Sequence, residues 1–319
     1  MYADLLEVNN LSAYYMVQPP IKAVDGVTLS LGENEILGIA GESGCGKSTF
    51  ALALLRLLRP PGNINGGDII FNGVSILKMP ENDFRKIRWK HISYIPQSSM
   101  NALNPVMRIQ EQFTEIINFH EGRKSKKELK IRIEEALAKV NLAPDILNMY
   151  PHELSGGMKQ RVIIAMAMLL NPEIIIADEP TTALDVVMQR KILQLLLDAK
   201  QVYGSSMIII THDMAVHAQI SDKIAVMYAG KVVCIGETGM LFDKPLHPYA
   251  QILISAIPSI KKTGELPSIP GLPPDPRNPP SGCRFHPRCP SFIKNKCDVE
   301  EPSLIEVKKN MLVACHLYG

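Results

Sequence analysis

The chain has 319 residues, 46% hydrophobic and 21% charged, so it is long enough to bury one large core and to carry an additional segment. Its formal net charge of +2 is close to neutral, and no basic domain or interleaved aromatic patch favours binding to nucleic acid. The first residues lack a basic region followed by an apolar stretch, so we expect no signal peptide and a location in the cytosol.

A phosphate-binding loop is the first informative element. An apolar run at residues 36–40 predicts a buried strand, the string GESGCGKS occupies residues 41–48, and residues 48–55 have helical character. The string fits the pattern G-x-x-x-x-G-K-[ST] in the strand and helix context that this pattern requires. Its glycines let backbone N–H groups turn inward at a helix N-terminus, where anions are favoured. We therefore expect phosphates here, with Lys47 at the β- and γ-phosphates and the Ser48 hydroxyl on Mg²⁺.

A glycine-rich turn that matches by chance is the alternative, and the flanking strand and helix disfavour it. Cys45 is interpreted as a small filler rather than a redox switch, because no resolving thiol lies near it in the sequence. The residues expected to contact the nucleotide are Gly41, Ser43, Gly44, Cys45, Gly46, Lys47, Ser48 and Thr49.

A basic run at residues 123–127 precedes a segment with helical periodicity. Ser125 and Glu128 fit the capping box of a helix. The apolar residues that then share one helical face are Leu129, Ile133, Leu137 and Val140. The basic run is therefore interpreted as a solvated helix start.

A second and rarer string, LSGGMKQR, occupies residues 154–161. The following run, residues 162–170, is apolar on all sides and predicts a buried helix. A membrane span needs roughly 20 such residues, so this run is too short to be one. Further along, residues 173–177 predict a buried β-branched strand that ends in the carboxylates Asp178 and Glu179, for which a solvated acidic turn is the alternative.

The phosphate-binding string and the LSGG string together resemble one large group of proteins, the ATP-binding cassette ATPases. The resemblance implies that ATP is hydrolysed with Mg²⁺ where two cassettes meet, because the LSGG loop closes over the ATP of a partner cassette. It assigns Ser155 and Gly157 to the γ-phosphate of the opposite cassette, toward which the following helix dipole would point. Asp178 matches the magnesium-binding aspartate and Glu179 the general base that polarises the attacking water.

Four smaller elements complete the cassette pattern in chain order. Tyr15 lies where the family places an aromatic ring on adenine, although Tyr14 or a plain strand aromatic are alternatives. Gln97 matches the residue that reaches the metal and the water and also touches the transmembrane partner. Asp185 matches the loop that crosses between cassettes, and His212 matches the switch histidine at the γ-phosphate.

Composition divides the chain into three parts. Residues 1–93 and 157–236 alternate strands and helices and are expected to form the α/β core of a P-loop nucleotide-binding domain. Residues 94–156 match the family's inserted helical subdomain, which carries the LSGG loop and faces the membrane subunits. Residues 237–319 form a small cysteine-containing C-terminal extension, in which a proline-rich stretch at residues 258–280 predicts an extended connector.

The C-terminal extension indicates which group of cassette ATPases the chain resembles. The strings HPYAQILISAIP at residues 247–258 and CRFHPRCP at residues 283–290 are similar to the extension of cassette ATPases from dipeptide, oligopeptide and nickel importers. This resemblance implies an ATPase at the cytoplasmic face of the membrane that drives uptake of di- or oligopeptides. Its implied partners are a second cassette, expected to be a different chain, two transmembrane permeases and, indirectly, a substrate-binding protein.

Functions other than peptide import are also possible for a cassette ATPase. Nickel import is the main alternative, and an exporter ATPase is the next. A cassette ATPase of DNA repair or chromosome organisation would carry a long heptad insertion between its two halves, and none separates residues 41–48 from residues 154–161. A translation-factor cassette protein would carry two cassettes, whereas each motif occurs once here. The peptide transported and the choice between homodimer and heterodimer are not encoded in these motifs.

Four of the six cysteines lie near the C-terminus, at Cys283, Cys289, Cys297 and Cys315. Disulfides are not expected in the cytosol, and a short proline-rich tail needs another means of stabilisation. Their intervals are wider than the paired spacings of zinc sites and fit a [4Fe–4S] cluster at least as well. The resemblance to peptide-importer ATPases implies such a cluster, with a structural role, and makes it the expected group. Zinc and unliganded thiols are the alternatives.

Overall fold

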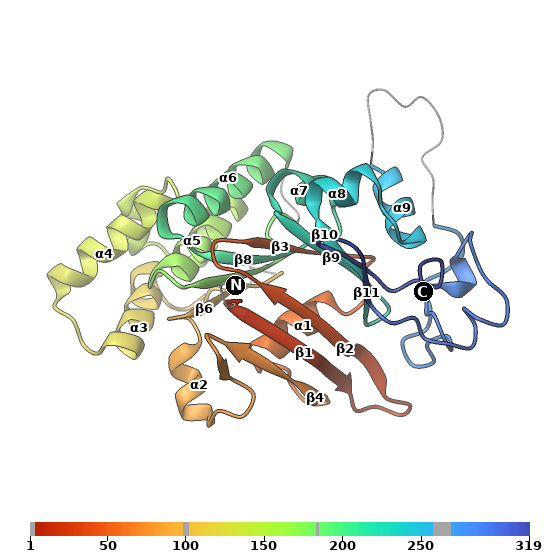
Figure 1. Cartoon of the computed structure of the whole chain (residues 1–319). Coiled ribbons are helices and arrows are strands. Elements are labelled where there is room, and N and C mark those ends of the chain that lie inside the picture. Colours follow the sequence, from red (N-terminus) through yellow and green to blue (C-terminus); the bar gives the residue numbers. More distant parts are fainter. Residues whose placement is uncertain (1–3, 98–101, 183–184, 258–268) are drawn as a thin grey trace. The chain divides into compact units, whose positions relative to one another are not determined.

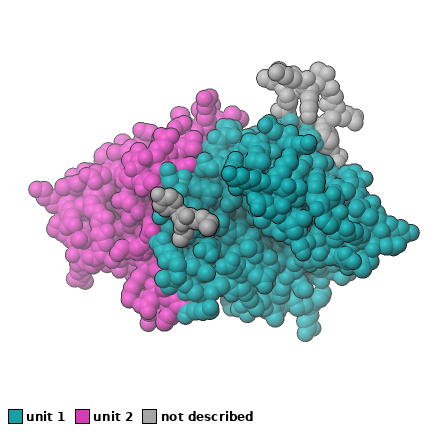
Figure 2. Space-filling model, viewed as in Figure 1, with its two compact units in different colours: residues 1–78, 210–319 teal, residues 79–209 magenta. Residues whose placement is uncertain are grey.

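The chain contains both helices and strands (Figure 1). It divides into two compact units. The residues that the computed structural model describes are 4–97, 102–182, 185–257 and 269–319. Unit 1 comprises residues 1–78 and 210–319, and unit 2 comprises residues 79–209 (Figure 2).

Unit 1 contains an antiparallel sheet with the strand order β2-β1-β4-β5. Its strands are β1 (Leu6–Tyr15), β2 (Ile21–Leu31), β4 (Gly62–Phe71) and β5 (Val74–Ser75). The inner strand β1 alternates buried with more exposed residues, as a sheet with one packed face does, and a register shift between Val8 and Leu11 interrupts the alternation. Both candidate adenine-stacking residues, Tyr14 and Tyr15, lie at the end of this strand.

A second sheet in unit 1 contains the strand that leads to the phosphate-binding loop. The strands follow the order β11-β12-β10-β9-β3. They are β3 (Ile36–Ala40), β9 (Lys223–Tyr228), β10 (Lys231–Glu237), β11 (Ile305–Lys308) and β12 (Met311–Val313). The predicted strand at residues 36–40 is confirmed: every residue of β3 is buried, and it pairs in parallel with β9. The last strands of the chain therefore extend the sheet that carries the loop.

The helices of unit 1 are α1 (Lys47–Leu54), α7 (Met214–Ile220), α8 (Thr238–Asp243) and α9 (Pro248–Ser255). A short 3₁₀ turn at His286–Arg288 follows an irregular stretch of the described residues 269–285, which contains no helix or strand. Part of the predicted proline-rich connector, including Pro258 and Pro267, lies outside the described residues.

Three aromatic rings hold the C-terminal residues against the sheet of unit 1. Tyr228 from β9, Tyr249 from α9 and Phe285 are buried, and their ring centroids lie 4.7 to 5.2 Å apart. The rings meet edge to face or tilted, which is the favourable arrangement for aromatic pairs. This cluster supplies the apolar contact that proline-rich residues alone lack.

Unit 2 contains a parallel strand pair with polar residues at its end. The strands follow the order β8-β7-β6, and β6 (Ile92–Ile95) and β7 (Ile174–Asp178) pair in parallel from Ile92 opposite Ile174. The third strand, β8 (Ser206–Ile210), is buried along its length. The carboxyl ends of parallel strands meet at one edge, so the residues that follow β6 and β7 lie close together.

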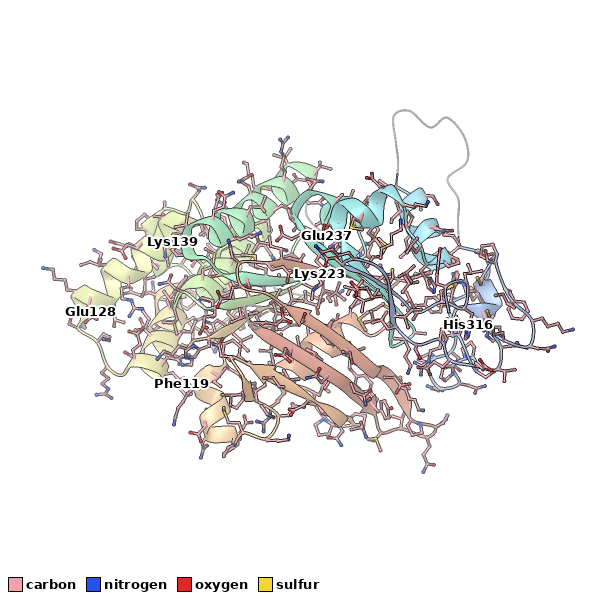
Figure 3. The ribbon with its side chains drawn as sticks, viewed as in Figure 1. Phe119, Glu128, Lys139, Lys223, Glu237 and His316 are labelled. Atoms are coloured by element: carbon pink, nitrogen blue, oxygen red, sulfur yellow. The ribbon has the colours of Figure 1, made fainter. Side chains whose placement is uncertain are left out.

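The helices of unit 2 are α2 (Glu81–Ile87), α3 (Ile109–Glu121), α4 (Lys126–Lys139), α5 (Gly156–Met168) and α6 (Val186–Tyr203). The predicted start of α4 is confirmed, since the Ser125 hydroxyl accepts a hydrogen bond from the backbone N–H of Glu128 (3.2 Å). Glu128 and Lys139 mark the two ends of this helix in Figure 3.

The predicted buried helix after the LSGG string is also confirmed. In α5 every residue from Val162 to Met168 is buried. No helix within the described ranges combines the length and the apolar character that crossing a bilayer requires.

Candidate active site

The phosphate-binding loop turns sharply between β3 and α1, and two of its glycines are required by close packing. Gly41 and Gly46 have φ values of +148° and +109°. A Cβ atom at Gly41 would lie 2.2 Å from the carbonyl oxygen of Met227, and one at Gly46 would lie 1.9 Å from that of Ala23. Gly44 also has a positive φ, of +79°, with open space around it. The glycines therefore allow the loop to pass close to the backbone of β9 at Gly41 and of β2 at Gly46.

Lys47 begins helix α1 and carries its charge into this loop. The residue is only 5% exposed, and its Nζ donates hydrogen bonds to the carbonyl oxygens of Gly41 (2.7 Å) and Glu42 (2.9 Å). The N-cap residue of α1, Gly46, has no side chain with which to cap the first N–H groups of the helix. A buried cation beside an uncapped helix N-terminus fits a phosphate group.

Cys45 packs inside the same loop. Burial raises the pKa of its thiol, although Lys47 opposes the shift, so the thiol is protonated at neutral pH. Its sulfur lies 3.7 Å from the Nζ of Lys47.

The two tyrosines at the end of β1 have different partners. The hydroxyl of Tyr15 lies 3.2 Å from Oγ1 of Thr49, in the first turn of α1. The hydroxyl of Tyr14 instead donates a hydrogen bond to Asp25 (2.6 Å), and burial together with this carboxylate raises the pKa of Tyr14. Tyr15, and not Tyr14, therefore contacts the helix that follows the phosphate-binding loop.

Asp178 is the last residue of β7 in unit 2. It is 1% exposed, and its Oδ2 accepts a hydrogen bond from the hydroxyl of Tyr94 (3.2 Å), which lies on the neighbouring strand β6. Burial, reinforced by the Asp178 carboxylate, raises the pKa of Tyr94, so this hydroxyl remains a donor at any physiological pH. A buried carboxylate held in this way is the donor type that Mg²⁺ prefers.

Glu179 follows at once, and its backbone has an unusual conformation. Its φ of +47° is rare for a residue with a side chain. The amide of Gln97 donates a hydrogen bond to Oε2 of Glu179 (2.8 Å), and the hydroxyl of Thr182 donates to the same oxygen (2.9 Å). The structure thus brings Gln97, Asp178 and Glu179 together, because they follow or end the paired parallel strands β6 and β7.

Two residues of this group were not predicted. Tyr94 lies in the YIPQ string that ends at Gln97, and Thr182 lies three residues after Glu179. Tyr94 is recognisable only once β6 and β7 are paired, because the carboxylate that it holds lies on the neighbouring strand. Thr182 holds a carboxylate within its own turn, and its spacing from Glu179 is the signal that could have identified it.

The LSGG loop lies beside the start of α6 within unit 2. Ser155 is exposed and caps α5, accepting a hydrogen bond from the backbone N–H of Met158 (3.3 Å). A Cβ atom at Gly157 would lie 2.6 Å from the methyl group of Met188, whose backbone N–H is capped by Asp185 (2.9 Å). The residues just before Asp185, 183 and 184, lie outside the described part of the chain.

The predicted site residues therefore fall into two sets. The phosphate-binding loop, Tyr15 and His212 belong to unit 1, where His212 is exposed between β8 and α7. The second set belongs to unit 2 and consists of Gln97, Ser155, Gly157, Asp178, Glu179 and Asp185.

The prediction of an iron–sulfur cluster is wrong. In the part of the chain that the structure describes, no group of three or more His, Cys, Asp or Glu residues is arranged to hold a metal ion, which also removes support for zinc. Cys283, Cys289 and Cys315 pack instead against the apolar core of unit 1, and Cys297 is buried. Burial raises the pKa of Cys283 to about 11 and also raises the pKa values of Cys289 and Cys315. These buried thiols are therefore less acidic than exposed cysteines.

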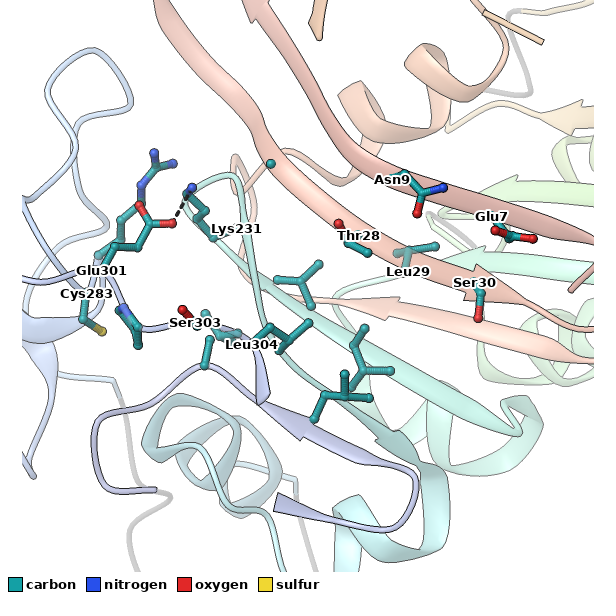
Figure 4. Close-up of a pocket in the computed structure, with 18 of the residues that line it drawn as sticks. Glu7, Asn9, Thr28, Leu29, Ser30, Lys231, Cys283, Glu301, Ser303 and Leu304 are labelled. Carbon is teal, nitrogen blue, oxygen red and sulfur yellow. Dashed lines mark ion pairs between the residues drawn. The ribbon is translucent and has the colours of Figure 1, made fainter. Parts of the chain in front are cut away.

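Figure 4 shows a cavity in unit 1, and its volume is about 630 Å³. Its wall includes residues of β2 and β10 and of the C-terminal residues 282–314, and none of the loop residues 41–48. Lys231 on this wall forms an ion pair with Glu301 (2.6 Å) and a longer one with Asp25 (3.5 Å). Charges neutralised in this way do not indicate a particular ligand.

Comparisons with known proteins agree with these features. The family model described as ABC transporter matches residues 24–182, and the model described as oligopeptide/dipeptide transporter, C-terminal region, matches residues 233–297. The dipeptide transport ATP-binding protein DppD of Caldanaerobacter subterraneus subsp. tengcongensis is 44% identical, covering 98% of this chain and 97% of the relative. The oligopeptide transport ATP-binding protein AppD of Bacillus subtilis is also 44% identical, covering 99% and 97%.

A solved structure supports the fold. The structure titled a dimeric structure of MJ0796, a bacterial ABC transporter cassette, is 31% identical and has a TM-score of 0.66, covering 73% of this chain and 98% of its own. A second structure of that cassette, in a post-hydrolysis state bound to ADP and Pi, gives the same TM-score at 30% identity. The predicted P-loop cassette fold is confirmed, and the chain is an ABC-type ATPase that belongs to the ABC transporter family of ATP-binding proteins, in the group with the oligopeptide/dipeptide transporter C-terminal region.

Proposed function

We propose that this chain is the ATP-hydrolysing subunit of a transporter that imports dipeptides or oligopeptides. The observation that carries the proposal is the pairing of a cassette with the C-terminal region of residues 233–297, in a chain that matches peptide-transport ATP-binding proteins along nearly its whole length. Nickel import has less support, since the relatives reported above are named for dipeptide or oligopeptide transport. The geometry of the site gives no separate support to an exporter.

The proposed nucleotide site uses the loop of unit 1. Backbone N–H groups from Gly41 to Thr49 and the ammonium group of Lys47 would bind the phosphates, and the ring of Tyr15 would stack on adenine. The support is the uncapped N-terminus of α1, the burial of Lys47 and the contact of Tyr15 with Thr49. The side chains proposed to hold Mg²⁺ are those of Ser48, Gln97 and Asp178, and the bound ion would neutralise charge on the phosphate oxygens.

Hydrolysis is assigned to Glu179 as the general base. The amide of Gln97 and the hydroxyl of Thr182 hold its carboxylate as an acceptor, which suits it to take a proton from a water molecule. His212 is proposed to contact the γ-phosphate, and its exposed position before α7 is compatible with that role.

A second cassette is proposed to complete the site. Ser155, Gly157 and Asp185 would contact the nucleotide or the loop of the partner, and Ser155 and Asp185 are both exposed. The first two residues of α6, Val186 and Val187, are 80% and 64% exposed, which leaves apolar surface beside Asp185 for a partner to cover. We propose a different chain as that partner.

The three-part division predicted from the sequence gives each part a role in this proposal. Residues 1–93 and 157–236 would bind and hydrolyse ATP. Residues 94–156, which include α3 and α4, would form the helical subdomain that contacts two permeases at the cytoplasmic face of the membrane. Residues 237–319 would form the C-terminal extension. A substrate-binding protein would deliver the peptide on the far side of the membrane.

Uptake by intact cells tests the proposed function. Cells that lack this gene are given either a radiolabelled dipeptide, a radiolabelled pentapeptide or radioactive nickel, and are complemented with the wild-type gene or with Lys47→Ala. We expect wild type, and not Lys47→Ala, to restore peptide uptake, with nickel uptake equal in all strains. Restoration of nickel uptake alone would contradict the proposal.

A further inference from the structure

The second residue of the phosphate-binding loop, Glu42, is held from the C-terminal part of the chain. The guanidinium of Arg288 donates one hydrogen bond to each oxygen of the Glu42 carboxylate, from Nη1 at 2.7 Å and from Nη2 at 3.1 Å. The backbone N–H of Glu42 donates to the hydroxyl of Tyr249 (2.9 Å). Both the side chain and the backbone of this loop residue are therefore fixed by residues more than 200 positions away in the sequence.

Arg288 is itself rigidly placed. It is 7% exposed, and its Nε donates to the carbonyl oxygen of Pro270 (2.8 Å) while Nη1 also donates to the hydroxyl of Tyr228 (3.2 Å). A bidentate ion pair between a guanidinium and a carboxylate is directional as well as charged, so it fixes the position of the carboxylate. The irregular residues around Pro270 thus serve to orient Arg288 toward the loop.

Tyr249 is placed by the start of α9. His247 caps this helix, its Nδ1 accepting a hydrogen bond from the backbone N–H of Tyr249 (3.0 Å). The Tyr249 ring is fully buried against Tyr228 and Phe285. Burial raises the pKa of the Tyr249 hydroxyl, which therefore stays neutral beside the loop.

These contacts explain the two strings that single out the C-terminal extension. The string at residues 247–258 provides Tyr249, and the string at residues 283–290 provides Arg288. Both reach Glu42, whose carbonyl oxygen in turn accepts a hydrogen bond from Lys47 (2.9 Å). A displacement of Glu42 would therefore also displace Lys47, the residue that is expected to bind phosphate.

We propose that Arg288 and Tyr249 are positioning residues for the nucleotide, through their hold on Glu42. The inference rests on the proposed function in one respect, namely that residues 41–49 bind the phosphates of ATP. A carboxylate at Glu42 repels a triphosphate unless a cation neutralises it and holds it to one side, and Arg288 does both. The C-terminal extension is thereby part of the nucleotide site.

Titration of the full-length chain with a fluorescent ATP analogue tests this inference. Removal of Arg288 leaves the charge of the partly exposed Glu42 carboxylate uncompensated beside the loop, so Arg288→Gln should weaken binding about tenfold. Glu42→Gln in the same chain removes that charge, and the double variant should return to within about threefold of wild type. Additive losses in the double variant would contradict the inference, because they would show that Arg288 acts on binding independently of Glu42.

A matched control is provided by Arg284, which lies four residues before Arg288. It is also buried and pairs with a different carboxylate, Asp25, which lies outside the loop. Arg284→Gln should therefore leave ATP affinity within about threefold of wild type, with no recovery on adding Glu42→Gln. A tenfold loss in this control would mean that general loosening of the extension, and not the contact with Glu42, sets affinity.

A second variant keeps the inference testable if Arg288→Gln does not fold. Tyr249→Phe keeps the buried ring and removes only the acceptor of the Glu42 N–H, so it should weaken ATP binding about threefold without loss of the folded state. Wild-type affinity in both Tyr249→Phe and Arg288→Gln would overturn the inference. Lys47→Ala, measured in parallel, separates the two hypotheses, because wild-type affinity in that variant would contradict the proposed nucleotide site itself.

Discussion

The phosphate-binding loop of unit 1 and the carboxylate turn of unit 2 are built from different parts of the chain. The loop presents backbone N–H groups, and its course depends on glycines such as Gly46 that have no room for a side chain. The turn after β7 presents side chains, and Glu179 is held there by Gln97 and Thr182. Backbone N–H groups can bind phosphate as long as the loop keeps its fold. A catalytic side chain, by contrast, is lost with a single substitution. Binding and hydrolysis should therefore be separable.

The sharpest test of this separation is Glu179→Gln. The amide keeps the size of the carboxylate but is a poor base, so we expect hydrolysis to fall about 10²- to 10⁴-fold. ATP binding should persist, because the loop of unit 1 is unchanged, and bound ATP should hold cassettes together as dimers. Steady-state hydrolysis and size-exclusion chromatography with ATP measure the two effects.

A suitable control is Glu115→Gln, which alters an exposed glutamate on α3 in the same unit. Its hydrolysis should match that of wild type. If turnover of Glu179→Gln also stayed within a few fold of wild type, Glu179 would not be the general base.

The reverse test changes the loop and leaves the carboxylates intact. Hydrogen bonds from a charged donor contribute about 1.5–3 kcal/mol, so Lys47→Ala should weaken nucleotide binding by the isolated chain about 10- to 100-fold. Ser155→Arg places bulk and charge where the phosphate of a partner cassette belongs, so it should leave the affinity of the isolated chain unchanged and impair only the dimer. Equal loss of affinity in the two variants would contradict the assignment of Ser155 to the opposite cassette.

The difference between the two regions also explains what could be predicted from the sequence. The loop at residues 41–48 is contiguous, and its glycines, its lysine and the flanking strand specify one local structure. The β-branched run before Asp178 is typical of a buried strand and predicts this carboxylate at the strand end. In both cases the local sequence is sufficient to predict the element, although Tyr94, the partner of Asp178, is 84 positions away.

Long-range contacts were not accessible in this way. Arg288 and Glu42 are 246 positions apart, and no local pattern pairs them. The four C-terminal cysteines were misread for the same reason, because their spacing says nothing about whether the thiols face one another or an apolar core. The residues that hold the extension are aromatic and basic, and their partners lie on strands of the sheet or in the loop.

Acid should weaken the scaffold behind the loop. His217 is fully buried, and a Cβ atom at Gly38 of β3 would lie 2.4 Å from its Nδ1. Burial lowers the pKa of His217 to about 4 from an ordinary 6.5, so the unfolded chain binds the extra proton as the pH falls below about 6.5. At about pH 5 this costs about 2 kcal/mol of unfolding free energy, most of the loss lying between pH 6.5 and 4.

Urea unfolding at several pH values measures this effect. The slope of the unfolding free energy against pH should be smaller in His217→Gln by about one proton, while His152→Gln, at an exposed position, serves as the control. The same slope in wild type and His217→Gln would show that another group governs the acid sensitivity.

Ser125→Ala has the smallest expected effect and tests whether a loss of stability alone changes nucleotide binding. Ser125 caps α4, which carries no residue of either site, and loss of an N-cap hydroxyl costs about 0.5–2 kcal/mol. Ser125→Ala should lower the unfolding free energy by that amount, with ATP affinity and turnover unchanged, whereas Ser125→Asp should retain the cap and the stability. If Ser125→Ala changed nucleotide affinity, general stability would be coupled to binding. The losses expected from Lys47→Ala and Arg288→Gln would then have to be corrected for stability before they could be attributed to the loop.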